Sequence, residues 1–223
     1  MSPTLGGGVR VRTRLIGSVD IVIGTTNPAK VRQCQLALRA SGLRVRSLTE
    51  VLPDAPEVAE DGVDAEENAA RKARAYSEAI GCPVLSLDYA LTFDGLPAES
   101  QPGMNVRRIP GVDGRASDDQ VLDYYSTLLA SYGGRLRGSW QAGAAVATPA
   151  GRLERTTIRI HRTFVAQPSA RRVEGYPLAS LQLAHGATYI SELSDEDEEQ
   201  LWQRVLGSPL HDLVADALGQ PGR

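Results

Sequence analysis

The chain has 223 residues, of which 42% are hydrophobic and 23% are charged. This length and composition suffice to bury the core of one domain and exclude a disordered chain or a short peptide scaffold. The formal net charge of −3 excludes a strongly basic protein built to hold nucleic acid, but it leaves a small charged substrate open. No apolar run approaches the ~20 residues of a membrane span, and residues 1–18 lack the apolar stretch of a signal peptide. We therefore expect a cytoplasmic protein without membrane contact.

Lysine is rare in this chain. Two of the 24 basic residues are lysines, Lys30 and Lys72, and the other 22 are arginines. Codon usage in a GC-rich genome explains a general excess of arginine wherever only a positive charge is needed. The two positions that keep lysine are candidates for a function that needs a compact ammonium group.

The first half of the chain alternates between strand and helix patterns. Strands are predicted where short β-branched apolar runs occur, and helices where apolar residues recur at three- to four-residue spacing. In chain order the predictions are a strand over 19–24, a helix over 28–40, a strand over 43–48, an acidic loop over 52–62, a helix over 64–80 and a strand over 84–87.

The second half adds further strands and two helices, and the whole pattern indicates an α/β protein with a central sheet. We expect a single domain over residues 19–218, with a flexible tail over 1–18 and a short tail over 219–223. The predicted elements are a loop over 95–114, a helix over 118–132, strands over 138–148, 153–160 and 163–166, and a helix over 194–217.

The loop Thr25–Lys30 connects the first predicted strand to the N-terminus of the first predicted helix. Backbone N–H groups and the positive end of the helix dipole favour anions at such a place. Lys30 adds a point charge suited to a phosphate, and Thr25, Thr26 and Asn27 add hydrogen-bonding groups. The loop lacks the spacing of a Walker A motif, and a helix cap followed by a surface lysine is the alternative interpretation.

Two further stretches carry candidate site residues. Asn68 and Lys72 are four residues apart in the second predicted helix, so they share one face of it. Asp88 ends an apolar strand, and the carboxyl ends of strands in open α/β sheets are where ligands usually bind. With Glu57 from the acidic loop, Asp88 has the ligand chemistry for Mg²⁺, which takes one or two carboxylates together with substrate phosphates. An ordinary ion pair for Lys72 and a turn-capping role for Asp88 are the alternatives.

In order and spacing, these stretches resemble the inosine triphosphate pyrophosphatase family, whose members hydrolyse non-standard purine nucleoside triphosphates. The family's D-D-S-G-L strand end appears here with Leu87 in place of the first Asp. The resemblance is specific over residues 19–111. The other motifs are T-G-N-x-x-K at residues 25–30, where Thr26 replaces the Gly, P-E-V-x-E-x-G at 56–62 and E-N-A-x-x-K-A at 67–73.

The resemblance implies an elongated mixed β-sheet flanked by helices, in two lobes with an active-site cleft, and a homodimer. It implies that Glu57 and Asp88 bind Mg²⁺ and that Asp88 activates the attacking water. The reaction would split the α–β phosphoanhydride of a nucleoside triphosphate, giving a nucleoside monophosphate and pyrophosphate. The residues that the resemblance assigns to phosphate and substrate are Thr25, Thr26, Asn27, Lys30, Asn68, Lys72 and Tyr89.

The second half of the chain departs from the family in the region that binds the base. The family's G-F-G-Y-D-P segment is reduced to residues 174–178, which keep Tyr176. Its base-contacting lysine is replaced by Glu198, and its S-H-R triplet is absent, with Arg204 near its place. Tyr176, Glu198 and Arg204 are candidates for a changed base pocket, whereas the two tryptophans fit the core or a subunit contact better.

The expected function is a Mg²⁺-dependent nucleotide pyrophosphatase whose base specificity has moved away from inosine and xanthosine, because exchanging lysine for glutamate reverses a charge at the base. A catalytically silent relative that binds a nucleotide or a partner protein is the alternative. Loss of the Asp at position 87 and of the base-reading residues favours that alternative. A nucleoside mono- or diphosphate is a third possible substrate.

Overall fold

The computed structural model describes residues 20–219, so the predicted tail over 1–18 lies outside the described residues. Seven strands form one sheet in the order β2-β1-β3-β4-β5-β6-β7. The strands are β1 (Asp20–Ile23), β2 (Arg44–Ser47), β3 (Val84–Phe93), β4 (Arg135–Ala147), β5 (Leu153–Val165), β6 (Gln182–His185) and β7 (Thr188–Tyr189). The helices are α1 (Pro28–Leu38), α2 (Leu48–Val51), α3 (Ala65–Ile80), α4 (Asp118–Ser131), α5 (Asp195–Trp202) and α6 (Ser208–Leu218).

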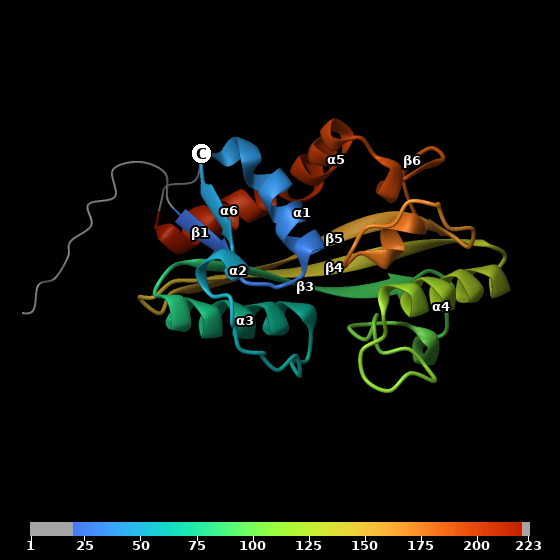
Figure 1. The fold of residues 1–223 in the computed structure, drawn as a ribbon, viewed down its shortest axis with the longest axis horizontal. Helices are drawn as coiled ribbons and strands as arrows, with labels where there is room; N and C mark the ends of the chain where they lie inside the picture. The colour runs from blue at the N-terminus through green and yellow to red at the C-terminus, as the bar shows by residue number, and fades with distance from the viewer. Residues whose placement is uncertain (1–19, 220–223) are drawn as a thin grey trace, which may run out of the picture.

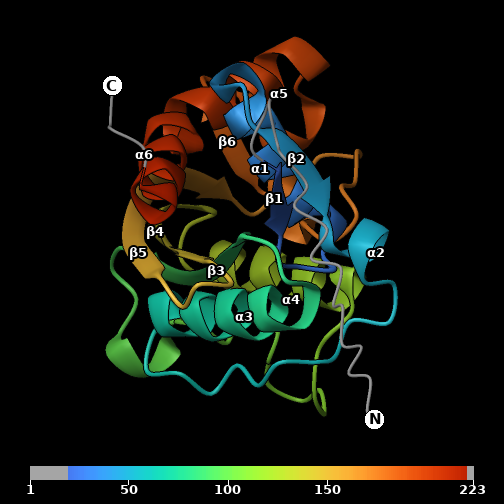
Figure 2. The ribbon, with the colours of Figure 1, turned by 90° about the vertical axis from the view of Figure 1, so that its left-hand side faces the viewer.

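The sheet is mixed. Strand β1 runs parallel to β2 and β3, and every later neighbour pair is antiparallel. Figures 1 and 2 show α3 and α4 on one side of the long strands β3, β4 and β5, with α1, α5 and α6 on the other. This arrangement is the mixed sheet flanked by helices that the sequence predicts.

Strand β3 is much longer than its parallel neighbour β1. Only Val22 and Ile23 of β1 pair with it, opposite Val84 and Leu85, and β1 ends at Ile23. Between Leu85 and Leu91, β3 therefore has β4 on one side and an open edge on the other, and at Leu91 a bridge to Gly103 closes that edge. Because successive residues of a strand point to opposite faces, the residues along this edge reach both helical layers.

The caps of the helices explain where they begin. The Asn27 side chain accepts hydrogen bonds from the backbone N–H groups of Ala29 and Lys30 and so caps α1. Asp64 caps α3 in the same way, and two acidic residues follow in its first turn. The predicted helices over 28–40, 64–80 and 118–132 are thus confirmed to within a few residues.

The second half of the chain differs from the predictions in three places. The strands predicted over 153–160 and 163–166 are one strand, β5, because the ladder with β4 continues through His161 and Arg162 although both interrupt the apolar pattern. Strands β6 and β7 were not predicted. The C-terminal helix is divided by a π-helical turn, Gln203–Gly207, between α5 and α6.

Two clusters of buried side chains lie on the sheet. The smaller one packs α3, through Ala69, Ala70 and Ala73, against one face of the sheet. The larger one includes residues of α1, α4, α5 and α6 and of all the long strands. Leu87, which stands where the family has its first Asp, is 1% exposed and belongs to the larger cluster. No helix within residues 20–219 is both long and apolar enough to cross a membrane.

Candidate functional site

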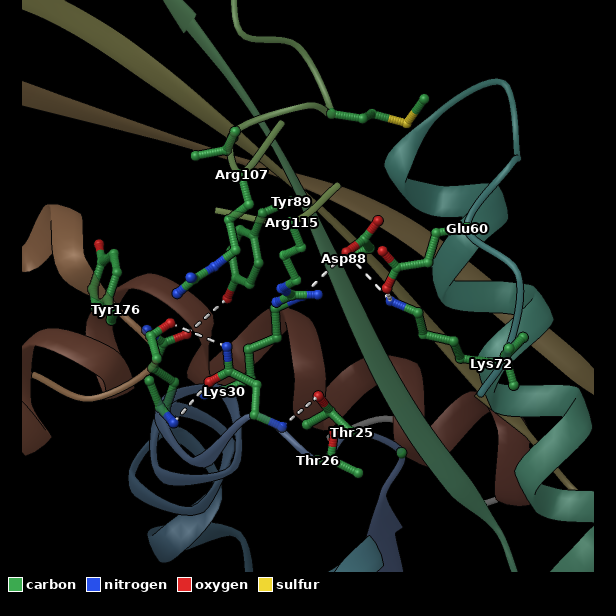
Figure 3. A pocket seen from close by; sticks show the side chains of 18 of the residues that line it. Thr25, Thr26, Lys30, Glu60, Lys72, Asp88, Tyr89, Arg107, Arg115 and Tyr176 are labelled. Atoms are coloured by element: carbon green, nitrogen blue, oxygen red, sulfur yellow. Dashed lines mark hydrogen bonds and ion pairs between the residues drawn. The ribbon is translucent and has the colours of Figure 1, made fainter. Parts of the chain in front are cut away.

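A cavity of about 930 Å³ lies beside the open edge of β3. Residues of β3 and residues beside α3 line one side of the cavity. Residues beside α1 and α5 line the other side. Its lining comes from loop 24–30, loop 55–61, α3, β3, loop 104–115, β4, β5, residues 175–178 and α5. Segments from both halves of the chain therefore enclose one space (Figure 3).

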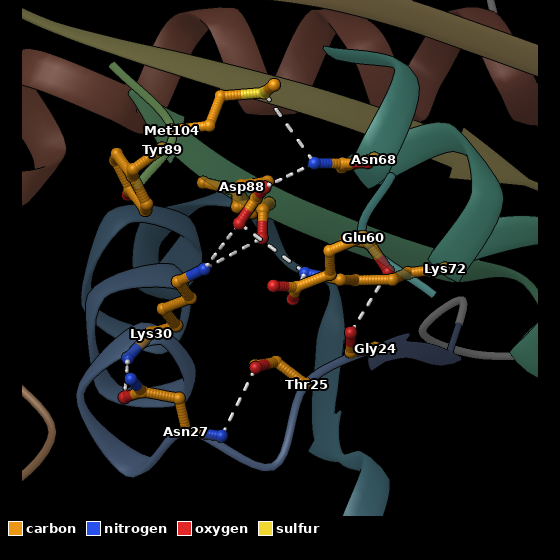
Figure 4. Close-up of polar contacts among 12 residues, drawn as sticks. Gly24, Thr25, Asn27, Lys30, Glu60, Asn68, Lys72, Asp88, Tyr89 and Met104 are labelled. Atoms are coloured by element: carbon orange, nitrogen blue, oxygen red, sulfur yellow. Dashed lines mark hydrogen bonds and ion pairs between the residues drawn. The ribbon is translucent and has the colours of Figure 1, made fainter. Parts of the chain in front are cut away.

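At the end of the cavity that lies nearest to α3, Asp88 is the central residue. Its Oδ1 atom lies 3.1 Å from Lys30 Nζ and 3.4 Å from Lys72 Nζ. Its Oδ2 atom accepts a hydrogen bond of 3.2 Å from the Asn68 side chain, whose own oxygen accepts one from the Gly62 N–H. Figure 4 shows both lysines reaching this carboxylate, Lys30 from α1 and Lys72 from α3. We call this part of the cavity, with Lys30, Asn68, Lys72, Asp88 and Glu60, the lysine end.

The ionisation of the lysine end follows from these contacts. Burial would raise the pKa of Asp88, but the charges of Lys30 and Lys72 and hydrogen bonds from Lys30 and Asn68 outweigh it. The pKa of Asp88 is therefore below its usual value, and the carboxylate is ionised at neutral pH. Burial lowers the pKa of Lys30, Asp88 opposes that shift, and Lys72 adds to it. Two ammonium groups thus share one buried carboxylate, and Lys72 also pairs with a second one, that of Glu60.

The prediction that Glu57 and Asp88 together bind Mg²⁺ stays a prediction. A second acid of the same loop, Glu60, forms an ion pair with Lys72. Glu57 also lines the cavity, but its side chain makes no hydrogen bond or ion pair within residues 20–219. Both glutamates belong to the matching P-E-V-x-E-x-G loop, so this loop brings two acids to the cavity. Within the same described residues, no three His, Cys, Asp or Glu side chains are grouped to hold a metal by themselves.

The loop before α1 connects the lysine end with a distant segment. Thr25 Oγ1 accepts a hydrogen bond of 3.2 Å from the Asn27 backbone N–H and so fixes the turn. The Asn27 side chain donates 3.0 Å to the Gly175 carbonyl, which lies 148 residues away in the sequence. Gly175 has φ of +75°, and a Cβ there would lie 2.6 Å from Asn27 Oδ1, so this close approach needs glycine. Thr26 lines the cavity beside this turn.

The opposite end of the cavity is walled by aromatic side chains. Tyr89, Trp140, Tyr176 and Trp202 line it, together with Ile160 and other apolar groups. Tyr89 meets Trp140 edge-on, with ring centroids 5.9 Å apart, and Tyr176 lies 6.5 Å from Trp140 and 6.4 Å from Trp202. We call this part the aromatic end, and its size and walls suit a planar ring.

Polar atoms of the aromatic end are fixed by hydrogen bonds to two glutamines. Gln182 Oε1 accepts bonds from Trp140 Nε1 at 2.9 Å and from the Tyr176 hydroxyl at 3.0 Å. The Tyr89 hydroxyl donates 3.1 Å to Gln33 Oε1 of α1. Burial raises the pKa of Tyr176 to about 12, so its hydroxyl keeps its proton at neutral pH. The walls of this end are thus rigid hydrogen-bonded groups.

Comparison with known proteins places the chain in a family. The sequence model of the Ham1 family matches residues 21–204, which is most of the chain. The chain belongs to the Ham1 family. It is 33% identical over 194 residues to a dITP/XTP pyrophosphatase of Frankia alni, covering 83% of this chain and 92% of that one. It is 36% identical over 135 residues to a dITP/XTP pyrophosphatase of Symbiobacterium thermophilum, and this match spans 60% of the chain and only 64% of that relative.

The fold is that of solved Ham1 proteins. A HAM1 protein from Coxiella burnetii superposes with a TM-score of 0.65, covering 89% of this chain and 99% of that one, at 21% identity. The resemblance noted from the motifs is therefore confirmed at the level of family and fold. What the relatives act on is considered below.

This Ham1-family chain brings most of the predicted site residues to one cavity. The predicted residues that line it are Thr25, Thr26, Asn27, Lys30, Lys72, Asp88, Tyr89 and Tyr176. Asn68 does not line it but donates a hydrogen bond to Asp88. Glu198 and Arg204 are not among the lining residues. Glu198 instead accepts hydrogen bonds from Arg32 and from Trp202 Nε1, and Arg204 is exposed. The charge at position 198 is therefore held at the surface between α1 and α5.

Several lining residues of the Ham1-family site had no sequence signal. Both tryptophans, expected in the core or a subunit contact, are buried and also wall the aromatic end. Arg107 and Arg115 come from the loop after β3, where arginine-rich composition hid them, and Figure 3 shows both beside Tyr89. Arg162 lies in the middle of β5, at a point where its charge argued against a continuous strand. The signal that could have identified Arg162 was a positive charge in the middle of a strand, on the face of the strand that lies towards the cavity.

Proposed function

We propose that this Ham1-family chain is a nucleoside triphosphate pyrophosphatase. It would hydrolyse the α–β phosphoanhydride of its substrate to a nucleoside monophosphate and pyrophosphate. The observation that carries the proposal is the Asp88 carboxylate held between Lys30 and Lys72 at one end of a cavity whose other end is aromatic. The two relatives described above, both called dITP/XTP pyrophosphatase, support the same class of reaction.

The lysine end suits a triphosphate because the ammonium groups of Lys30 and Lys72 are neutralised there by carboxylates, which are weaker anions than a triphosphate. Each phosphate oxygen of a substrate would compete with Asp88 and Glu60 for the ammonium groups of Lys30 and Lys72. As the lysines turn to phosphate, the pKa of Asp88 rises towards its ordinary value, because the charges that lower it move away. Substrate binding would thus make Asp88 a better base at the moment when a base is needed.

In the proposed step a water molecule adds to phosphorus, Asp88 takes its proton, and the bond to the leaving pyrophosphate breaks. The two ammonium groups stabilise the charge that develops on the phosphate oxygens. Asn68 positions Asp88 through the hydrogen bond to Oδ2, leaving Oδ1 for the lysines. Tyr89, with its ring 5.3 Å from Lys30 Nζ, keeps that ammonium directed to the cavity.

Mg²⁺ fits the donor set at this end of the cavity. Asp88 supplies a hard carboxylate donor, Glu57 and Glu60 line the same cavity, and Mg²⁺ typically needs only one or two carboxylates because substrate phosphates and water complete its coordination. When bound, the ion would neutralise charge on the transferred phosphate. We expect removal of Mg²⁺ with EDTA to abolish pyrophosphate release and added Mg²⁺ to restore it. Full turnover in EDTA would contradict the metal requirement.

We further propose that the base preference differs from selectivity for inosine and xanthosine. The family's base-contacting lysine is Glu198 in this chain, and Glu198 is engaged with Arg32 outside the cavity lining. The S-H-R triplet is absent as well. The aromatic walls accept any planar ring of suitable size. Groups other than these walls must therefore select among the bases.

The test is pyrophosphate release, in the presence of Mg²⁺, from a panel of natural and modified nucleoside triphosphates. We expect Asp88→Asn to reduce kcat by about 100-fold or more, since it removes the general base. The matched control is Asp94→Asn, an exposed residue directly after β3. Failure of the wild-type chain to release pyrophosphate from any triphosphate, or equal rates for wild type and Asp88→Asn, would overturn the proposal.

A catalytically silent nucleotide-binding protein is the second candidate. Leu87, buried in the core where the family has an Asp, favours it. Tight nucleotide binding by calorimetry without release of pyrophosphate or orthophosphate is the result that would support this candidate. The homodimer implied by the resemblance stays a prediction that light scattering would check.

A further inference from the structure

Glu198 joins α5 to α1 through one oxygen of its carboxylate. It stands in α5, which lies beside α1 (Figure 1). Its Oε2 atom accepts hydrogen bonds of 2.8 Å from Arg32 Nε and 2.7 Å from Arg32 Nη2. Asp195, the first residue of α5, accepts a bond of 2.8 Å from the same Nη2 atom. The Glu198 carboxylate is therefore held in place, although 21% of its side chain is exposed to solvent.

The other oxygen of the same carboxylate holds Trp202. Glu198 Oε1 accepts a hydrogen bond of 3.3 Å from Trp202 Nε1, one helical turn later, and this indole N–H has no other acceptor within residues 20–219. Trp202 is 3% exposed and lines the aromatic end. A buried indole N–H needs an acceptor, and an ionised acceptor binds it more strongly than a neutral one. The bond to Glu198 therefore restricts rotation of the ring that walls the cavity.

Helix α1 fixes two of the aromatic walls from adjacent positions. Gln33 accepts the hydrogen bond of the Tyr89 hydroxyl, and its neighbour Arg32 anchors the carboxylate that holds Trp202. Lys30 of the same helix belongs to the lysine end. The walls of the aromatic end are thus positioned relative to a cation of the phosphate site by one helix.

We propose that Glu198, anchored by Arg32, is a positioning residue that holds the Trp202 ring in the orientation in which it packs on the base of a bound nucleotide. The inference rests on the proposed pyrophosphatase function. Glu198 does not line the cavity, so it acts through Trp202. Position 198, where the family has a base-contacting lysine, supports a wall of the cavity in this chain. This support favours binding of the base without distinguishing one planar ring from another.

The experiment compares Glu198→Leu with the wild type, using one nucleoside triphosphate that the wild type hydrolyses. KM for pyrophosphate release should rise by roughly 5- to 20-fold, because the indole N–H loses its acceptor. The kcat value should stay within about twofold, since Asp88 and the two lysines are untouched. Inorganic tripolyphosphate is the second probe, because it can occupy the lysine end and has no base. Its inhibition constant should also stay within about twofold of the wild-type value.

The matched control is Glu199→Leu. Glu199 is 24% exposed and likewise pairs with an arginine outside α5, Arg39, and with a side chain one turn later, Gln203, at 2.9 Å. Gln203 does not line the cavity, so all three constants should equal those of the wild type. Equal rises of KM in both variants, an unchanged KM in Glu198→Leu, or a tripolyphosphate constant that rises together with KM would overturn the proposal. The last result would mean that α1 and the lysine end had moved as well.

A double mutant tests whether Glu198 acts through the indole N–H. Trp202→Phe keeps an aromatic wall without that donor, so adding Glu198→Leu to it should change KM by less than about twofold. Additive effects of the two changes contradict positioning of Trp202. If Glu198→Leu does not fold, Arg32→Met decides, since it keeps the indole bond and removes the anchor. It should raise KM by roughly 2- to 5-fold at an unchanged tripolyphosphate constant, and an unchanged KM contradicts the proposal.

The two proposals fail in different ways. A wild-type chain that releases no pyrophosphate from any triphosphate contradicts the proposed function. The Kd of a nucleoside triphosphate with a methylene bridge between its α and β phosphates, measured by calorimetry, then replaces KM in the same comparison. Equal Kd values for wild type and Glu198→Leu would contradict the role of Glu198. A wild-type chain that releases pyrophosphate, with an unchanged KM in Glu198→Leu, contradicts that role alone and leaves the function intact.

Discussion

At the scale of single residues, the chemistry of the cavity depends on why two positions in an arginine-rich chain are lysines. Lys30 Nζ contacts both Asp88 Oδ1 and the Leu87 carbonyl oxygen, the latter at 3.3 Å, in a buried place beside the Tyr89 ring. Lys72 Nζ reaches the same Asp88 oxygen from α3. Two compact ammonium groups can converge on one oxygen, whereas two planar guanidinium groups with fixed forks cannot do so without moving apart.

We therefore expect Lys72→Arg to reduce kcat/KM for pyrophosphate release by about tenfold or more, although the charge is kept. Arg71→Lys is the reciprocal control, since Arg71 forms its ion pairs with Asp61 and Glu67 at the surface and does not line the cavity. Its kcat/KM should stay within about twofold of the wild type. Comparable losses in both variants would show that the lysine end does not depend on a compact charge.

The depressed pKa of Asp88 also links the lysine end to stability. Because the pKa is lower in the folded than in the unfolded chain, the stabilisation by Asp88 is fully present above the unfolded pKa and is lost as the pH falls through the folded one. The difference in unfolding free energy between wild type and Asp88→Asn should be largest at neutral pH and should shrink below about pH 4. Urea unfolding of both proteins across this range measures it, and a difference independent of pH would contradict the stated ionisation.

Residue patterns predicted the lysine end better than the aromatic end for a physical reason. Lys30, Lys72 and Asp88 belong to local motifs at a loop, a helix face and a strand end, each of which carries its own signal. Arg162 and Trp140 come together through the register of β4 and β5, and no local spacing encodes that register. The ion pair of Glu60 with Lys72 likewise depends on how loop 55–61 lies against α3.

At the scale of elements, the N-terminus of α1 is tied to a segment far along the chain. Asn27 caps α1 with its Oδ1 atom and holds Gly175 with its Nδ2 atom. The Gly175 N–H in turn donates 2.8 Å to Asp118, the first residue of α4. The turn before Tyr176 thus joins the lysine end, through α1, to the helix that covers the other half of the sheet.

Gly175→Ala should disrupt this junction. A Cβ at φ +75° is strained, and here it would also lie 2.6 Å from Asn27 Oδ1. The control is Gly151→Ala, which has φ of +85° and nothing within 4 Å of the added Cβ. We expect a loss of about 1 kcal/mol of unfolding free energy for the control. A clearly larger loss, with a raised KM, is expected for Gly175→Ala, and equal effects of the two changes on stability and KM would contradict the junction.

Two of the elements that sequence reasoning missed are strands that need a partner to form. Strand β7 has two residues and pairs with the four-residue strand β6, and neither has enough alternating apolar positions to be recognised alone. Helices α1, α3 and α4 begin at side-chain caps that the sequence displays, at Asn27, Asp64 and Ser117. Capping residues therefore predicted where these helices begin better than apolar patterns predicted short strands, whose position depends on the strands that pair with them.

At the scale of the whole molecule, the larger buried cluster runs through both halves of the chain. It joins Ile21 and Leu85 near the start of the fold with Tyr125, Phe164 and Leu213. The cavity lies along the same boundary, since its lysine end is built from residues before 90 and its aromatic end largely from residues after 104. The two halves of the chain share a core in this way and should therefore unfold together.

We therefore predict one cooperative unfolding transition for residues 19–218. The chain has two tryptophans, Trp140 and Trp202, and both wall the aromatic end, so their fluorescence reports on the cavity while far-UV circular dichroism reports on all helices and strands. The two signals should give coincident transitions.

A nucleotide analogue with a methylene bridge between its α and β phosphates, at 100 times its Kd, should stabilise the chain by about 2.7 kcal/mol. For a domain of this size that shifts both transitions together by roughly 5 to 10 °C. Separate transitions, or a shift seen by tryptophan fluorescence alone, would mean that parts of the chain unfold as independent units and that the ligand stabilises only one of them.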